Sequence, residues 1–272
     1  MKTILVPTDF SEHALYALKV AAIIAKKTNA KINLVHNYPM PEEEFSNAFF
    51  YDDMIKEIKA AKNNQLDRLI FEDFLKDIHV KKYILFNTKM WKIVSDKRFK
   101  NTDLIAIGSH GTSGLNEFFI GSNTEKVVRL ANSPVLTIKN EYSGFNIQEM
   151  IFASDFFGES YEAFKKIKFF ADIYGAHTHL LKVITATDFE PSHVSRKLME
   201  NFAKKFKLTD ATINICNATS IEKGITDFSN RINADLIAIE THGRTGFAHL
   251  INGSLAEDVA NHIDRPVLSV KM

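Results

Sequence analysis

The chain has 272 residues, 45% of them hydrophobic and 25% charged, which is the composition of an ordinary globular protein of about two average domains or one large one. Its formal net charge of +1 gives no electrostatic reason to expect a nucleic acid or an acidic membrane surface as a partner. The single cysteine, Cys216, excludes an internal disulfide and a cysteine metal cluster. There is no apolar run of about 18 residues, and the apolar stretch in residues 1–7 is too short for a signal peptide, so we expect a cytoplasmic protein without a membrane partner.

The chain contains two copies of one sequence pattern. Residues 101–139 and 233–271 align without a gap, and 17 of the 39 positions are identical. The starts of the halves also match, because ILVPTDF at 4–10 parallels MIFASDF at 150–156. This similarity is typical of a duplicated domain. We place the domains at 1–140 and 147–272, with a short linker near Asn140–Gln148.

The first copy is longer than the second. The shift between the copies is 146 residues at their starts and 132 at their ends, so the first half has 14 extra residues in its middle. The polar stretch Pro39–Asp53 is the best place for them. We interpret this insertion either as a lid or as a contact surface, and the sequence does not choose between the two.

The first half alternates short apolar runs with helical patterns. Ser11 is placed to cap a helix after the first run, and a spacing of 3, 4 and 3 puts Leu15, Leu18, Ala22 and Ala25 on one face of that helix. A long amphipathic helix is expected after the second strand, another helix near Trp91, and a third after Gly121. The expected strands are Thr3–Val6, Ile32–His36, Val80–Phe86, Asp103–Gly108 and Val135–Lys139.

The second half repeats this order. After a strand near 150–153, the residues Phe164, Ile167, Ala171 and Tyr174 again show the spacing 3, 4 and 3. The later strands are expected at Thr178–Val183, Thr212–Cys216, Leu236–Ile239 and Val267–Lys271. Apolar strands separated by helices indicate a parallel sheet covered on both faces. We therefore predict an α/β fold of two tandem five-stranded doubly wound modules, whose ligands bind at the carboxyl ends of the strands where strand order reverses.

One loop has the composition of a phosphate-binding site. The sequence Gly-Ser-His-Gly at 108–111 ends the fourth strand, and Gly121-Ser122 opens a helix after a spacer of nine residues. Glycine lets a ligand approach the backbone closely, and a helix N-terminus offers free N–H groups and a positive dipole end to an anion. Phosphate binding and simple turn chemistry both account for this loop on its own.

Asp9 ends the first strand, which lies next to the fourth strand across the point of reversal. Its carboxylate can accept hydrogen bonds from a ribose hydroxyl or from an adenine amino group. It can equally cap the helix that follows. The residue type alone does not separate these roles.

Taken together, these features resemble the universal stress protein family over nearly all of the chain. The resemblance rests on Pro7-Thr8-Asp9-Phe10-Ser11, on Leu34-Val35-His36 and on the pattern G-x-x-G-(nine residues)-G-S. In that family the glycine spacing separates the ATP-binding branch from the branch that does not bind ATP. The resemblance also implies an adenine nucleotide alpha hydrolase-like fold, and pairing of the last strands as in a family dimer, which here makes an intramolecular pseudo-dimer. A further homodimer stays open.

The resemblance implies a ligand and the residues around it. The ligand is ATP, with or without Mg²⁺. Residues implied around the adenine and ribose are Pro7, Thr8, Asp9 and Val35. Residues implied around the phosphates are Gly108, His110, Gly111, Gly121, Ser122, Asn123 and Thr124.

The second copy departs from the pattern at one glycine. Glu240 stands where the first copy has Gly108, and a carboxylate about 4 Å from a phosphate costs on the order of 4 kcal/mol even at an effective dielectric near 20. Arg244 or a divalent ion could neutralise it. We expect one nucleotide site in the first half and a degenerate site in the second. The corresponding second-site residues are Ser154, Asp155, Gly243, Gly253 and Ser254.

Two pairs of histidines are candidates for catalytic or metal-binding residues. His110 and His242 occupy equivalent loop positions, but no serine or carboxylate lies at triad-like spacing, so we predict no catalytic residue. His177 and His179 alternate at the start of a strand and could hold a metal. No third ligand is visible near them in the sequence, so we predict no metal site.

These features favour a stress-response module that binds ATP and changes its contacts with partners, a role that needs no catalytic base. One alternative is a slow ATP-hydrolysing enzyme, for which Asp9, His110 and Ser122 are thin support. The other is an interaction scaffold whose nucleotide sites are vestigial.

Overall fold

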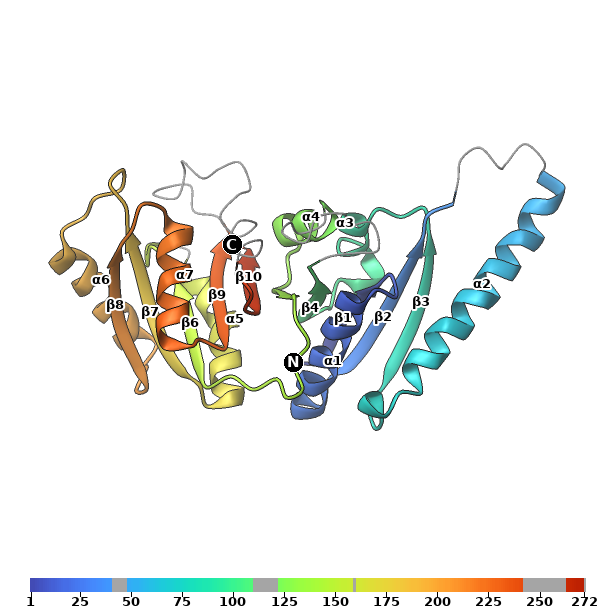
Figure 1. The fold of residues 1–272 in the computed structure, drawn as a ribbon, viewed down its shortest axis with the longest axis horizontal. Helices are drawn as coiled ribbons and strands as arrows, with labels where there is room; N and C mark the ends of the chain where they lie inside the picture. The colour runs from blue at the N-terminus through green and yellow to red at the C-terminus, as the bar shows by residue number, and fades with distance from the viewer. Residues whose placement is uncertain (41–47, 110–121, 159, 242–262, 272) are drawn as a thin grey trace.

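The computed structural model describes residues 1–40, 48–109, 122–158, 160–241 and 263–271. Their strands form one ten-stranded sheet in the order β3-β2-β1-β4-β5-β10-β9-β6-β7-β8. Strand pairs within each half are parallel, and β5 and β10 pair in antiparallel fashion where the halves meet. The two halves therefore lie side by side along one sheet (Figure 1).

The first half contains five strands, as predicted. They are β1 (Thr3–Thr8), β2 (Lys31–Tyr38), β3 (Val80–Phe86), β4 (Leu104–Gly108) and β5 (Val135–Ile138). The described helices of this half are α1 (Glu12–Thr28), α2 (Ala48–Ile70), the short α3 (Met90–Ile93) and α4 (Ser122–Leu130). Two 3₁₀ turns cover Asp73–Leu75 and Lys97–Phe99.

The second half repeats the five strands. They are β6 (Glu149–Ala153), β7 (His177–Ile184), β8 (Ala211–Asn217), β9 (Leu236–Thr241) and β10 (Val267–Lys271). Its described helices are α5 (Ser160–Tyr174), α6 (Ser192–Lys205) and α7 (Ile221–Ile232). In each half the first three strands extend the sheet in one direction and the last two in the other, so the doubly wound prediction is confirmed.

Local sequence explains where α1 begins and ends. Ser11 is its N-cap, and the Ser11 hydroxyl accepts a hydrogen bond from the Ala14 N–H at 3.3 Å. Asn29 ends the helix in the left-handed conformation, at φ 54°. Leu18 and Ala22 are buried on the predicted face.

The sheet separates two hydrophobic layers because side chains alternate along a strand. In β1, Ile4 and Val6 face the layer under α1, α2, α5 and α6, whereas Leu5 faces the layer under α3, α4 and α7. The first layer in the second half is dominated by phenylalanine. Phe202 of α6 packs within 5.8 Å, centroid to centroid, of Phe152, Phe156 and Phe164. These phenylalanines are therefore packing residues.

The two halves share their core. Leu136 of β5 pairs in register with Leu268 of β10, and both side chains are buried in the first layer. Phe145 and Ile147 of the linker are buried there as well. The last strand of each module, an exposed edge in isolation, is thus covered by its counterpart.

The extra length of the first half lies between β2 and β3. α2 has 23 residues, whereas its counterpart α6 has 14. Of the predicted insertion Pro39–Asp53, the part from Ala48 onward belongs to α2, and residues 41–47 lie outside the described residues. α2 runs beside β3 at the outer edge of the sheet (Figure 1). No helix in the described part of the chain has the length and apolar character of a membrane span.

Candidate functional site

The predicted site residues of the first half that the structure describes converge on the carboxyl edge of the sheet. β1 lies between β2 and β4, so strand order reverses between β1 and β4. Pro7 is in register with Val35 of β2, and Asp9 follows β1 directly. Gly108 ends β4, and α4 begins at Ser122. His110, Gly111 and Gly121 lie outside the described residues.

The turn between β1 and α1 is built from its own polar side chains. The Asp9 carboxylate accepts a hydrogen bond from the Ser11 N–H at 3.0 Å, and the Thr8 hydroxyl accepts one from the Phe10 N–H at 3.1 Å. Phe10 adopts the left-handed conformation, at φ 67°. Since Ser11 caps α1, Asp9 shapes the turn that brings its carboxylate to the strand end, and the N-cap alternative for Asp9 is wrong.

Gly108 sits directly beneath the start of α1. A Cβ atom at this position would lie 2.6 Å from the carbonyl carbon and oxygen of His13 and 2.9 Å from the Ala14 nitrogen. Any side chain here would therefore push the first turn of α1 away from the strand. The absence of a side chain at Gly108 lets the helix approach closely, which is a stronger reason for glycine than turn chemistry.

Thr124 fixes the start of α4 against the same strand end. Its side chain is buried, and its hydroxyl donates a hydrogen bond to the Gly108 carbonyl at 3.0 Å. This contact holds the N-terminus of α4, with its positive dipole end, beside the end of β4. The Thr124 hydroxyl therefore already has a partner within the protein, and its role beside the phosphates stays a prediction.

His36 joins the ends of β1 and β2. Its Nδ1 donates a hydrogen bond to the Thr8 carbonyl at 2.8 Å, and its ring lies 4.5 Å from the Phe10 ring. Burial lowers the pKa of His36, which favours the neutral ring. Its buried Nε2 is left with a lone pair and no hydrogen-bond partner among the described residues.

Lys62 is a residue of this edge that the sequence did not indicate. From α2, its ammonium lies 5.4 Å from the centre of the Phe10 ring and 5.6 Å from that of Tyr38. The nearby charge contributes to the lowered pKa of His36. The position of Lys62 depends on how α2 packs beside β3, so no local motif could have revealed it.

The carboxyl edge of the second half starts from the same turn. The Ser154 hydroxyl accepts a hydrogen bond from the Phe156 N–H at 2.8 Å, as Thr8 does in the first half, and Phe156 is left-handed at φ 65°. Asp155 likewise accepts from the Phe157 N–H at 2.8 Å. Residue 159 lies outside the described residues, and α5 is described from Ser160 onward.

The Glu240 side chain lies beside this turn and the first described residue of α5. Its carboxylate lies 2.6 Å from the Ser154 hydroxyl and 2.7 Å from the Ser160 hydroxyl, both of which donate to it. Ser160 stands where the first half has Ala14, so the serine and the glutamate occur together. Burial raises the pKa of Glu240 to about 7. The Glu240 carboxyl group is therefore buried at the end of β9 and hydrogen-bonded to two serines of the same domain.

This arrangement adds detail to the interpretation of the second site. We expected Glu240 to disfavour phosphate at a degenerate site, and named Arg244 or a divalent ion as groups that could neutralise it. In the described residues, two serines hold the carboxyl group. Gly243, Arg244, Gly253 and Ser254 lie outside the described residues.

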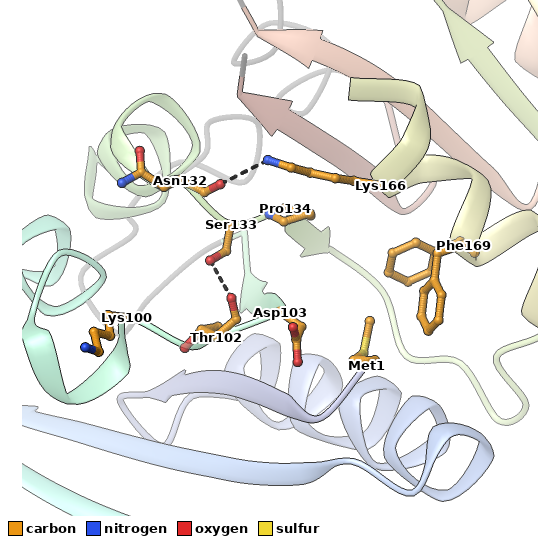
Figure 2. Close-up of a pocket in the computed structure, with 10 residues that line it drawn as sticks. Met1, Lys100, Thr102, Asp103, Asn132, Ser133, Pro134, Lys166 and Phe169 are labelled. Carbon is orange, nitrogen blue, oxygen red and sulfur yellow. Dashed lines mark hydrogen bonds between the residues drawn. The ribbon is translucent and has the colours of Figure 1, made fainter. Parts of the chain in front are cut away.

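A pocket of about 440 Å³ lies at the opposite end of the strands. Its walls include Met1, which precedes β1, Asp103, which precedes β4, and Phe169 of α5 (Figure 2). Lys166 of α5 reaches across it to the Asn132 carbonyl at 3.5 Å. The pocket is formed where the halves meet at the amino ends of the strands, so it is separate from the site at the point of reversal.

Comparison with known proteins agrees with this architecture. The model of the universal stress protein family matches residues 1–139 and again residues 146–271. The chain belongs to the universal stress protein family. A universal stress protein of known structure from Archaeoglobus fulgidus matches 99% of this chain over 98% of its own length, with 22% identity and a TM-score of 0.77. This tandem universal stress protein thus shares its fold with a protein that it matches over nearly the full length of both chains.

Shorter relatives match about half of the chain. Universal stress protein MJ0577 of Methanocaldococcus jannaschii is 29% identical over 159 residues, which cover 52% of this chain and 97% of that protein. A universal stress protein solved in complex with cAMP covers 46% of this chain at 18% identity and a TM-score of 0.38. Likeness at that level carries no ligand over, so the argument for a ligand rests on the residues of this chain.

Proposed function

We propose that the first domain binds ATP, as its Mg²⁺ complex, and that the protein is a nucleotide-responsive regulatory module of the stress response. The observation that carries the proposal is the strand end at Gly108. Gly108 ends β4, which pairs with β1 before the Asp9 turn, and its carbonyl accepts a hydrogen bond from Thr124 at the start of α4. Free N–H groups at a helix start are suited to phosphate oxygens.

The charges around this edge suit an adenine nucleotide. The dipole of α4 places roughly half a positive charge at its first turn, and Lys62 adds a full positive charge from α2. Asp9 supplies an acceptor for ribose hydroxyls. In the nucleotide complex, Pro7, Thr8 and Val35 flank the adenine and ribose, whereas Gly108, His110, Gly111, Gly121, Ser122 and Asn123 flank the phosphates.

We propose that the second domain does not bind ATP. Glu240 brings a carboxyl group to the position equivalent to Gly108, and the Ser154 and Ser160 hydroxyls that hold it there are no longer available to a ligand. With domains at 1–140 and 147–272, the protein would act as an intramolecular pseudo-dimer with one active nucleotide site. The pairing of β5 with β10 supports this assignment.

Calorimetric titration with ATP and Mg²⁺ tests the proposal, and the duplication supplies a matched control. Asp9→Asn should weaken ATP binding about tenfold, because one charged hydrogen bond to the ligand is worth roughly 1.5 kcal/mol. Asp155→Asn makes the same change in the second half and should leave the affinity unchanged. We expect one ATP per chain.

Two outcomes contradict the proposal. Two equal sites would show that Glu240 does not close the second domain, and the absence of binding would favour a scaffold with vestigial sites. Mass spectrometry of the bound ligand after incubation separates the remaining alternatives. Intact ATP supports the regulatory module, and conversion to ADP supports a slow ATP-hydrolysing enzyme.

A further inference from the structure

Two histidines and a glutamate meet at the amino edge of the second half, far along the strands from Glu240. Glu149 begins β6, and His177 begins the neighbouring strand β7. The two residues are paired in register. His179 lies two positions further along β7, so its side chain leaves the same face of the sheet as that of His177. Strand pairing thus brings together residues that are 28 positions apart in the sequence.

The ligand atoms of these three residues converge. One ring nitrogen from each histidine and one carboxylate oxygen of Glu149 lie within 4.8 Å of one another. His179 Nε2 is 2.7 Å from Glu149 Oε2, and the two histidine rings are 4.7 Å apart, centroid to centroid. The side chains of His177 and His179 are 27% and 12% exposed, so the set is partly shielded yet open to solvent on one side.

Residues of β8 and of the turn before it hold both imidazoles in place. Asp210 accepts a hydrogen bond from His177 Nδ1, which leaves Nε2 as the nitrogen that is available to a metal. The Thr212 hydroxyl forms a hydrogen bond with His179 Nδ1 at 2.8 Å, on the side of the ring away from Glu149. Metal-binding histidines nearly always have such a partner on their second nitrogen, because it sets the tautomer and the orientation of the ring.

We propose that Glu149, His177 and His179 bind a divalent transition-metal ion of the zinc type. Two imidazoles and one carboxylate form a three-ligand zinc set, in which water completes the tetrahedron. Imidazole ligands also favour zinc over magnesium or calcium. Zinc takes the place of the hydrogen on His179 Nε2, and the ring keeps its one proton on Nδ1, from which it donates to the Thr212 hydroxyl. Neighbouring zinc ligands are roughly 3.3 Å apart, so the present 2.7 Å contact has to open by about half an ångström.

The first half provides an internal comparison. Thr3 and Lys31 are paired in β1 and β2 in the same register as Glu149 and His177, and Asn33 takes the place of His179. None of these three is a zinc ligand, and Lys31 would repel a cation. The site is therefore a property of the second half alone. Its ion would link β6 to β7 directly, and to β8 through Asp210 and Thr212.

Zinc titration of the metal-stripped, nucleotide-free protein against a chromophoric chelator tests the proposal. We expect one tight zinc per chain that raises the thermal unfolding midpoint, and a Co²⁺ adduct with the visible absorption of a tetrahedral complex. His179→Ala should weaken zinc binding at least about 100-fold. Asp210→Asn, which alters only the positioning of His177, should weaken it about tenfold or more.

Two further variants separate metal binding from effects on folding. Glu149→Gln keeps an acceptor for His179, so it should fold and melt like the metal-free wild type while losing tight zinc binding. His193→Ala removes an exposed histidine on α6 and should bind zinc like the wild type. Zinc binding that survives in both His179→Ala and Glu149→Gln would belong to other ligands and would overturn the proposal, as would the absence of a one-to-one zinc complex.

Discussion

The buried carboxyl group of Glu240 predicts a pH-dependent stability that one substitution should remove. The perturbation is Glu240→Gln, which keeps the size of the side chain and can still bond to the Ser154 and Ser160 hydroxyls. It removes the titration. Comparison of this variant with the wild type therefore isolates one ionisable group in a chain that has many.

The direction of this pH dependence follows from the pKa of Glu240 in the folded and in the unfolded protein. In the folded protein, burial raises the pKa of Glu240 from its ordinary 4.5 to about 7. Below pH 4.5 the carboxyl group is protonated in both the folded and the unfolded protein, and its contribution to the free energy of unfolding is fully present. As the pH rises through the window from 4.5 to about 7, the unfolded chain releases its proton first, so the folded state loses stability relative to it. Above that window the loss is complete.

The magnitude follows from the same two values. One pH unit between the folded and unfolded pKa is worth about 1.4 kcal/mol, so the free energy of unfolding should fall by roughly 3 kcal/mol across the window. That is a large part of the 5–15 kcal/mol typical of a domain. The burial of the carboxyl group is the largest cause of the raised pKa.

Urea unfolding followed by circular dichroism at a series of pH values measures the effect. The difference between wild type and Glu240→Gln should change by roughly 3 kcal/mol between about pH 4.5 and about pH 8. Glu200→Gln on the exposed face of α6 is the control and should follow the wild type. Parallel pH profiles for wild type and Glu240→Gln would refute the reasoning, whatever the constant offset between them.

Three further changes test other contacts. Gly108→Ala would place a methyl group 2.6 Å from the His13 backbone, so it should destabilise the protein by about 1–3 kcal/mol. It should also weaken ATP binding measured by calorimetry, and an unchanged affinity would contradict the assignment of the site. Ser160→Ala removes a hydrogen-bond donor to the Glu240 carboxylate, so it should lower the free energy of unfolding in urea by about 1.5–3 kcal/mol above pH 7. The loss should be smaller below pH 4.5, where the Glu240 carboxyl group is neutral. An equal loss at both pH values would argue against the hydrogen bonds between Glu240 and the two serines. Phe202→Ala opens a cavity among buried rings and should cost about 3–5 kcal/mol by the same measurement, whereas a cost below about 1 kcal/mol would contradict its place in the core.

The sequence was sufficient for the fold because its signals are local and repeated. β3 and β10 begin and end at the predicted residues, and Ser11 caps α1 as expected. β2 and β7 extend one or two residues beyond the predicted bounds at each end, because the ladder continues through flanking residues such as Lys31, Asn37 and His177. The duplication helped, because a pattern that occurs twice leaves little room for a different order of elements.

The sequence was less informative about the sites because their contacts depend on register. Glu149 lies 28 positions before His177, and only the pairing of β6 with β7 places the two side by side. Ser160 lies 80 positions before Glu240, and only the pairing of β6 with β9 and the packing of α5 bring the two side chains together. Aligning the two halves position by position does hint at the contact between Ser160 and Glu240, because the second half replaces both Ala14 and Gly108 with polar residues.

The duplicated halves differ at both ends of their strands, in opposite ways. At the carboxyl edge the first half has Gly108 packed against α1, and the second half has Glu240 held by Ser154 and Ser160. At the amino edge the second half assembles Glu149, His177 and His179, whereas the first half has Thr3, Lys31 and Asn33. Since both halves contribute to one sheet and one continuous core through β5 and β10, each change alters one site without altering the scaffold. A fused pair can therefore carry two different ligand chemistries that a symmetric dimer of identical chains would have to duplicate.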